Sequence, residues 1–146
     1  MGVTGDRSAV VIGDRGTGYI EGFPLGTKSA NETELALMEF AGSARIRRAW
    51  ADCPPELILA CKRMKIVHDK ATPGHPQTNG WAERLVRKVF EGAKVFLSAA
   101  GRPPQFWPYA IRDYCFAENI KMVEGDSAWN KRFKNCLLYT SPSPRD

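Results

Sequence analysis

Two acidic residues, Asp52 and Glu83, stand where a fold could bring their carboxylates together. Asp52 ends a predicted strand and Glu83 falls in the first turns of a predicted long helix, and open α/β sheets gather reactive groups at such strand ends and helix starts. The positive end of the helix dipole favours the ionised form of Glu83, which metal ligation requires. Two carboxylates can begin a divalent-metal site of the kind used in phosphoryl transfer. Their spacing alone fits solvated surface charges equally well.

The elements that precede these carboxylates begin with a predicted β-hairpin. A short β-branched run from Ala9 to Ile12 and an extended run from Tyr19 to Leu25 flank a glycine-rich turn, Gly13 to Gly18. The turn has neither the lysine of a phosphate-binding P-loop nor the spacing of a dinucleotide fingerprint, which favours a simple hairpin turn. Pro24 indicates an edge strand or a strand end.

The rest of the chain alternates helices with strands. A long helix is the clearest, because apolar residues recur at helical spacing from Val86 to Leu97. The resulting order, β-β-α-β-α-β-α-α, predicts a mixed α/β fold. After the hairpin we expect a helix from Ser29 or Asn31 to about Phe40, a strand from Arg45 to Ala51, a helix from Pro54 to about Met64, a strand from Ile66 to His68, the long helix from about Asn79 to Ala100, and a last helix from Gln105 to Ile120.

Composition places the chain among soluble globular proteins. Its 146 residues are 43% hydrophobic and 25% charged, which fits one domain of ordinary size. No apolar run approaches the roughly 20 residues that span a bilayer, and the start lacks the apolar segment of a secretory signal. We therefore expect an intracellular protein, nuclear or cytoplasmic, that is not secreted and has no membrane partner. The four cysteines lack the short paired spacings of structural zinc sites, which favours reduced thiols.

The end of the chain differs in character from the rest. From Cys136 to Asp146 the helical pattern stops and serine and proline take over. This string resembles a one-frame translation of an adapter used to build sequencing libraries; a disordered tail is the alternative. We expect residues 1–135 to form one partial domain, and residues 136–146 to take no part in fold or function.

Two segments around the carboxylates resemble a known family. Residues 51–57 (ADCPPEL) and 72–84 (TPGHPQTNGWAER) are similar to the S-D-N-x-x-E-F/L and H-P-Q-x-N-G-x-x-E-R segments of retroviral and retrotransposon integrase catalytic cores. The second match is dense and specific. The resemblance extends over about Ala9 to Phe133, including the hairpin and residues 106–110 and 127–133.

The resemblance implies an RNase H-like fold, with three layers around a mixed sheet, and an Asp-Asp-Glu triad that holds two Mg²⁺ (or Mn²⁺) ions for DNA 3′-end processing and strand transfer. Carried over to this sequence, Asp52 is the second triad residue and Glu83 the third. The first triad residue belongs on the first strand of that fold. We expect that strand upstream of Met1, in preference to Asp6 or Asp14, so this chain is expected to be inactive on its own.

The resemblance also implies DNA as the partner, both element ends and target DNA, and a homo-oligomer for the full-length enzyme. The net charge of +5, from 21 Lys and Arg against 16 Asp and Glu, is compatible with a polyanionic partner but common elsewhere. The candidate DNA contacts are Arg84, Arg87 and Lys88 on the long helix and Gln77 and Asn79 in the loop before it.

Alternative interpretations remain open at this stage. The basic residues of the long helix also fit an ordinary solvated helix face. For Arg45, Arg47 and Arg48 the solvent side of an edge strand is the favoured interpretation. The whole chain could be a non-catalytic DNA-binding relic of an integrase, or a fragment that is not stably folded alone.

Overall fold

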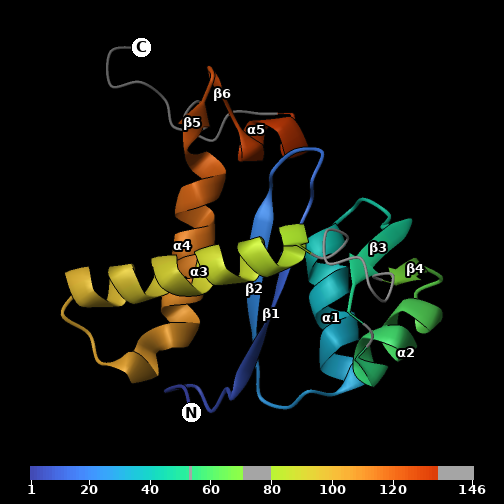
Figure 1. Ribbon diagram of the computed structural model, residues 1–146, viewed down its shortest axis with the longest axis horizontal. Helices are drawn as coiled ribbons and strands as arrows, with labels where there is room; N and C mark the ends of the chain where they lie inside the picture. The colour runs from blue at the N-terminus through green and yellow to red at the C-terminus, as the bar shows by residue number, and fades with distance from the viewer. Residues whose placement is uncertain (53, 71–79, 135–146) are drawn as a thin grey trace.

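The computed structural model describes residues 1–52, 54–70 and 80–134 (Figure 1). It confirms the predicted mixed α/β order and adds a small hairpin and a helix after it. The first half contains β1 (Ser8–Gly13), β2 (Ile20–Leu25), α1 (Ala30–Ala41), β3 (Arg48–Ala51), α2 (Pro55–Arg63) and β4 (Val67–Lys70). The second half contains α3 (Gly80–Ala99), the short 3₁₀ helix η2 (Pro104–Phe106), α4 (Trp107–Ile120), β5 (Met122–Val123), β6 (Asp126–Ser127) and α5 (Ala128–Phe133).

The first two strands form the predicted antiparallel hairpin. Its turn is held by Asp14, whose backbone N–H donates to the carbonyl of Tyr19 at 2.8 Å. The Asp14 carboxylate accepts from the N–H of Gly16 at 3.0 Å and from the hydroxyl of Thr17 at 2.9 Å. Within the described part of the chain β2 pairs with β1 alone, in keeping with the edge position that Pro24 indicates.

Alternation along β1 places the hairpin between two helical layers. Ala9 and Val11 pack against a buried cluster that contains residues of α3 and α4. Val10 and Ile12 point the other way and pack with Phe40 of α1 and its neighbours. Because successive strand side chains face opposite sides, this one strand is covered on both faces, which gives the three-layer arrangement.

The expected single mixed sheet is divided into separate ladders. β1 pairs with β2, and β3 pairs in parallel with β4, but no described strand joins β1 to β3. The helix α1 connects them instead: Leu37 lies in a buried cluster on which both Ile12 of β1 and Ala49 of β3 pack. Figure 1 shows β3 and β4 standing apart from the hairpin, with α1 beside both. β3 is also shorter than the predicted strand, which began at Arg45.

Local sequence explains where the helices begin and end. The side chain of Ser29 caps α1 by accepting the N–H of Glu32 at 3.2 Å, so Ser29 rather than Asn31 is the cap. The helix ends at Gly42, whose φ of 58° suits glycine. α2 carries Pro55 in its first turn, where a backbone N–H would have no hydrogen-bond partner within the helix.

The sequence assigned no element to residues 122–133, where the structure has β5, β6 and α5. Gly125, with a φ of 84°, turns the short hairpin between β5 and β6. The hydroxyl of Ser127 then caps α5 by accepting the N–H of Asn130 at 3.1 Å. Strands of two residues leave no period-2 pattern, which explains why they were missed.

The described cysteines behave as structural thiols. Cys61 and Cys115 are free and buried, in agreement with the expected reduced state. Burial raises the pKa of the Cys115 thiol to about 12, which keeps it protonated at neutral pH.

A buried amide fixes α4 to the start of β2. Asn119 is 2% exposed, and its side chain accepts from the N–H of Ile20 at 2.9 Å and donates to the carbonyl of the same residue at 2.7 Å. Because Asn119 and Ile20 are far apart in the sequence, these two bonds fix the position of α4 relative to β2.

Replacing Asn119 by Leu should lower the free energy of unfolding by about 2–3 kcal/mol, because it leaves the buried N–H and carbonyl of Ile20 without partners. Urea denaturation measures the loss. The Gln105→Leu exchange is the matched control, because Gln105 is exposed and its side chain bonds to no described residue, and it should change stability by less than about 0.5 kcal/mol. Equal effects of the two variants would contradict this role of Asn119.

Candidate functional site

The first candidate carboxylate follows β3 directly. Asp52 comes after Ala51, the last residue of β3, which pairs with Lys70 at the end of β4. Because the two strands are parallel, both carboxyl ends lie at the same edge of this ladder. Asp52 is exposed there, at the strand end where the sequence analysis places it.

The second carboxylate lies in the first turn of α3. Glu83 is exposed, while Leu85, two residues later, is buried in the core. The helix therefore presents Glu83 to solvent and anchors its first turns through neighbouring apolar side chains. This placement agrees with the position predicted from the sequence.

One cleft connects the two positions. It has a volume of about 740 Å³ and is lined by Ala51, directly before Asp52, and by Trp81 and Ala82, directly before Glu83. The end of β3 and the start of α3 therefore open onto the same hollow.

Close packing at Gly13 sets the position of the first turn of α3. A Cβ atom at Gly13 would lie 2.5 Å from a methyl group of Leu85 and 2.6 Å from the ring of Trp81. Only glycine lets the helix approach the end of β1 this closely. The guanidinium of Arg15 lies 5.7 Å from the centroid of the Trp81 ring, which adds a cation–π contact between the hairpin and α3.

Neither Gly13 nor Trp81 was recognised from the sequence as a positioning residue. The sequence does contain a signal for Trp81. An aromatic residue two positions before Glu83 is well placed to anchor the first turn of α3. The sequence contains no such signal for Gly13. Its glycine-rich surroundings indicate a turn, whereas the structure places it at the end of β1.

The basic residues of α3 divide into two groups. Arg84 and Arg87 are exposed and have no ion pair with any described residue. Lys88 forms an ion pair with Glu118 of α4, with its Nζ 2.7 Å from the carboxylate. The charge of Lys88 is thus partly satisfied within the fold. Gln77 and Asn79, the two candidates in the loop, lie outside the described residues.

The described carboxylates do not by themselves complete a metal site. Among residues 1–52, 54–70 and 80–134, no group of three or more His, Cys, Asp or Glu side chains could hold a metal ion. Asp14 is engaged in the hairpin turn and lies 3.8 Å from the guanidinium of Arg132. Asp6 accepts a hydrogen bond from Thr4 near the start of the chain. Asp52 and Glu83 offer the oxygen ligands that Mg²⁺ prefers, but they need further donors.

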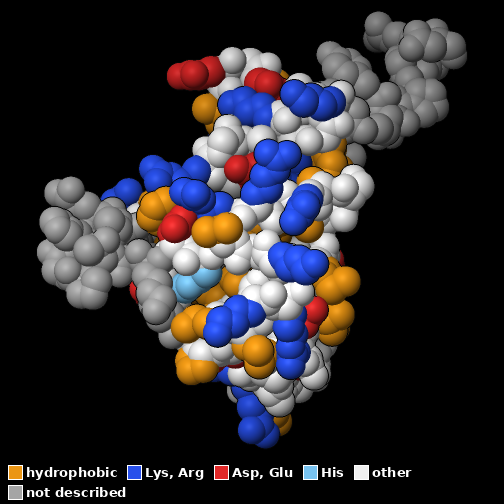
Figure 2. Space-filling view, turned by 90° about the vertical axis from the view of Figure 1, so that its right-hand side faces the viewer, with side chains coloured by type: hydrophobic (Ala, Val, Ile, Leu, Met, Phe, Trp, Pro, Cys, Tyr) orange, Lys and Arg blue, Asp and Glu red, His pale blue; other side chains and the backbone are white. Residues whose placement is uncertain are grey.

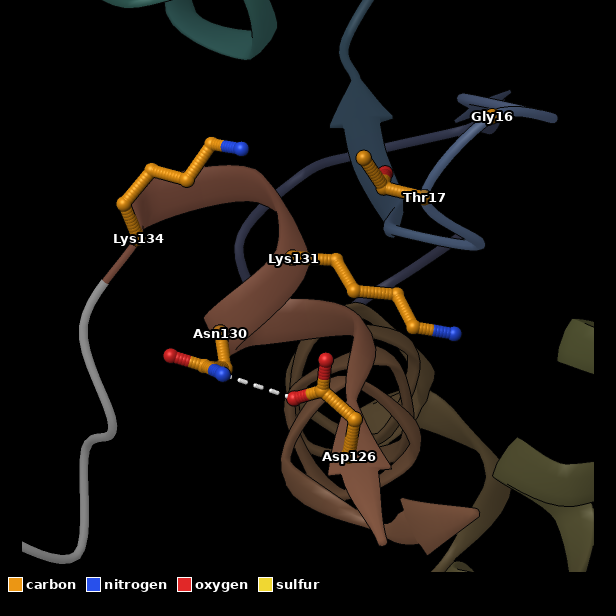
Figure 3. Close-up of a pocket in the computed structure, with 6 residues that line it drawn as sticks. All are labelled: Gly16, Thr17, Asp126, Asn130, Lys131 and Lys134. Carbon is orange, nitrogen blue, oxygen red and sulfur yellow. Dashed lines mark hydrogen bonds between the residues drawn. The ribbon is translucent and has the colours of Figure 1, made fainter. Parts of the chain in front are cut away.

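A second, shallower hollow lies between the β1–β2 turn and α5 (Figure 3). Its side chains come from both segments, and Asn130 donates to Asp126 at 2.7 Å within it. This bond, together with the N–H of Ser127, lowers the pKa of the Asp126 carboxyl. The hollow is lined by Gly16, Thr17, Asp126, Asn130, Lys131 and Lys134.

In the described part of the chain, no helix combines the length and apolar character that a membrane span requires.

Comparison with known proteins links this geometry to retroelements. No protein-family profile matches the chain. It is 39% identical over 59 residues, 40% of its length, to the retrovirus-related Pol polyprotein from transposon TNT 1-94 of Nicotiana tabacum. It is 31% and 30% identical over 112 residues, 72% of its length, to the Pol polyproteins from transposons RE1 and RE2 of Arabidopsis thaliana. The chain spans 4% of the tobacco polyprotein and 8% of each Arabidopsis polyprotein.

The fold agrees with the sequence comparison. The crystal structure of the catalytic core domain of BIV integrase superposes with a TM-score of 0.64 over 86% of both chains, at 15% sequence identity. This chain is a relative of retrotransposon Pol polyproteins with the fold of an integrase catalytic core. The predicted RNase H-like integrase-core fold and the predicted family resemblance are therefore confirmed.

In this integrase-core fold, Gly13→Ala should lower the free energy of unfolding by about 1–3 kcal/mol, because the new methyl group overlaps Leu85 and Trp81. Adding Leu85→Ala should recover part of the loss by making room, which a double-mutant cycle in urea measures. Gly16→Ala is the control, since its Cβ would meet nothing closer than 3.4 Å. Strictly additive losses would contradict a contact between β1 and α3 at Gly13.

Proposed function

We propose that this chain is the catalytic core of a retrotransposon integrase, a polynucleotidyl transferase that processes DNA 3′ ends and joins them to target DNA. The observation that carries the proposal is that the residues directly before Asp52 and Glu83 line one cleft within an integrase-core fold. The relationship to retrotransposon Pol polyproteins supports the same reaction class. The enzyme would act inside the cell, in the nucleus or cytoplasm, as a homo-oligomer when full length.

Asp52 and Glu83 would hold Mg²⁺ or Mn²⁺ in this proposal. A carboxylate at a strand end and another in the first turn of a helix both supply the hard oxygen ligands that Mg²⁺ prefers. Bound divalent ions would neutralise charge on the phosphate and activate the attacking hydroxyl. The remaining carboxylate of the site would come from outside the described residues, because the described ones form no group of three.

Arg84 and Arg87 would hold the DNA backbone beside the carboxylates. They are exposed, three residues apart on α3, and so share one face of the helix directly after Glu83. Guanidinium groups bind phosphate oxygens in pairs of hydrogen bonds, which orients the strand as well as attracting it. Lys88 would contribute less, because its ion pair with Glu118 must be given up first.

A non-catalytic DNA-binding relic of an integrase is the second candidate. The incomplete acidic set of the described residues favours it specifically. The two candidates differ in one property: a catalytic core needs a shared metal site at Asp52 and Glu83, whereas a relic needs basic residues alone.

We expect the chain to bind Mn²⁺ weakly, in the millimolar range, and Asp52→Asn and Glu83→Gln each to weaken that binding several-fold. Relaxation enhancement of water protons by Mn²⁺ measures it. Because both carboxylates would serve one site, the double variant should be scarcely worse than either single variant.

The control for the metal measurement is Asp113→Asn, which removes an exposed carboxylate on α4 and should leave Mn²⁺ binding unchanged. Equal losses at Asp113 and Asp52, or additive losses at Asp52 and Glu83, would argue for scattered surface binding. The relic would then be the better account.

For DNA binding, replacing Arg84 and Arg87 together by Ala should reduce the slope of log K against log salt by about 2, since each lost phosphate contact removes about 0.9. Fluorescence anisotropy with a duplex oligonucleotide measures the slope. Lys88→Ala should reduce it by less than Arg87→Ala, and Lys62→Ala on α2 is the matched control. An unchanged slope in the double variant would refute the assignment of this helix face.

A further inference from the structure

A carboxylate of α4 faces the basic side of α3. Only 21% of the Glu118 side chain is exposed, and its two oxygens lie near two different lysines. Oε2 is 2.7 Å from the Nζ of Lys88 on α3, and Oε1 is 4.0 Å from the Nζ of Lys121, directly after α4. One carboxylate therefore lies between two cations.

Close packing between the two helices holds this carboxylate in place. α3 lies across α4 (Figure 1), and a Cβ atom at Gly92 of α3 would be 2.1 Å from the ring of Tyr114 on α4. The ring of Phe96 meets the same ring edge-on, with centroids 5.5 Å apart. The Tyr114 hydroxyl donates a hydrogen bond to the Glu118 carboxylate. The helix crossing thus fixes the ring that directs Glu118.

Lys88 belongs to the proposed DNA-binding face of α3. It lies four residues after Arg84, so the two side chains share one side of the helix. The Lys88 side chain is 53% exposed and can reach a ligand in solvent as well as Glu118. Among the described residues, Arg84 and Arg87 have no acidic partner, and Lys88 is the exception on this face.

The pair of Lys88 and Glu118 sets up a competition between two anions. Ion pairs that are this exposed are weak and give way to other partners. A DNA phosphate is such a partner, and its binding to a lysine releases a counterion. Glu118 would then be left as a charge with little access to solvent, which is costly unless another cation takes over. Lys121 is already 4.0 Å away and can do so.

We propose that Glu118 competes with DNA for Lys88, and that Lys121 takes over the carboxylate when DNA binds. In the free chain Glu118 holds Lys88, which weakens binding to any polyanion. DNA that Arg84 and Arg87 already hold recovers Lys88 as a third contact. Glu118 therefore selects for a backbone that follows the whole face of α3. The exchange rests on the proposed DNA binding at this face and needs neither metal nor catalysis.

The overall charge of the chain must be separated from this local exchange. The net charge is +5, and the face shown in Figure 2 carries many Lys and Arg side chains. Removing any carboxylate from such a chain strengthens its general attraction for DNA. Glu39→Gln is the matched control, because Glu39 pairs with Arg112 of α4 at 3.7 Å and not with a residue of α3.

Fluorescence anisotropy with a duplex oligonucleotide, in buffer free of divalent ions, measures the competition. Glu118→Gln can still accept the hydrogen bond of Tyr114, and it should bind the duplex about twofold to fivefold more tightly. The slope of log K against log salt should become steeper by up to about 0.9, because one more phosphate contact forms. Glu39→Gln should tighten binding by less than about 1.5-fold and leave the slope unchanged.

Further variants identify the cations. In the Glu118→Gln chain, Lys88→Ala should reduce the slope by about 0.9, as much as Arg87→Ala does, whereas in the parent chain its effect is smaller. Lys121→Gln should weaken duplex binding in the parent chain but have no effect in the Glu118→Gln chain, where no carboxylate needs it. Tyr114→Phe removes only the hydrogen bond that directs Glu118, so it should tighten binding less than Glu118→Gln does.

Four results would overturn the proposal. These are no gain in Glu118→Gln, an equal gain in Glu39→Gln, a gain in Glu118→Gln that persists together with Lys88→Ala, and equal weakening by Lys121→Gln in both chains. The third result would mean that Glu118 repels DNA directly, and the fourth that Lys121 attracts DNA independently of Glu118.

Failure of this exchange is distinct from failure of the proposed function. If Arg84 and Arg87 carry no part of the salt slope, the DNA-binding face itself is wrong. If they do carry it and Glu118→Gln leaves the contribution of Lys88 unchanged, the face stands and the competition by Glu118 is wrong.

Discussion

The close contact between β1 and the helices on both of its faces is the constraint on which the rest of the structure depends. Val10 and Ile12 pack against the layer that contains α1, while Ala9 and Val11 pack against the layer that contains α3 and α4. Each candidate carboxylate is attached to one of these layers, Asp52 through β3 and α1, and Glu83 through α3. Their relative position is therefore set by a strand that contains neither of them.

The same constraint explains why the cleft is where it is. The helix α1 packs against both the hairpin and the β3–β4 ladder, and residues of β1 and β3 line the cleft between them. The end of β3 and the start of α3 open onto the same cleft as a consequence of this packing. The elements that carry the two candidate carboxylates meet at this cleft, because Ala51 before Asp52 and Ala82 before Glu83 both line it.

Much of this could be predicted from the sequence, for physical reasons. The hairpin and the helices have strong local signals, namely β-branched runs, the Ser29 cap and the helical spacing from Val86 to Leu97. The two carboxylates have none of these signals, and only the resemblance of residues 51–57 and 72–84 to integrase cores singles them out. Other features depend on contacts distant in sequence and leave no local signal. The bonds of Asn119 to Ile20 and the ion pair that occupies Lys88 are of this kind.

The measurement that tests the central claim most directly is Mg²⁺-dependent joining of an oligonucleotide to plasmid DNA, by this chain extended upstream through the in-frame coding sequence of its source locus. The account predicts joining that is abolished by Asp52→Asn and by Glu83→Gln but retained in Asp113→Asn. Joining that survives the loss of Asp52 or Glu83, or DNA binding with no joining by a folded extended chain, would contradict it.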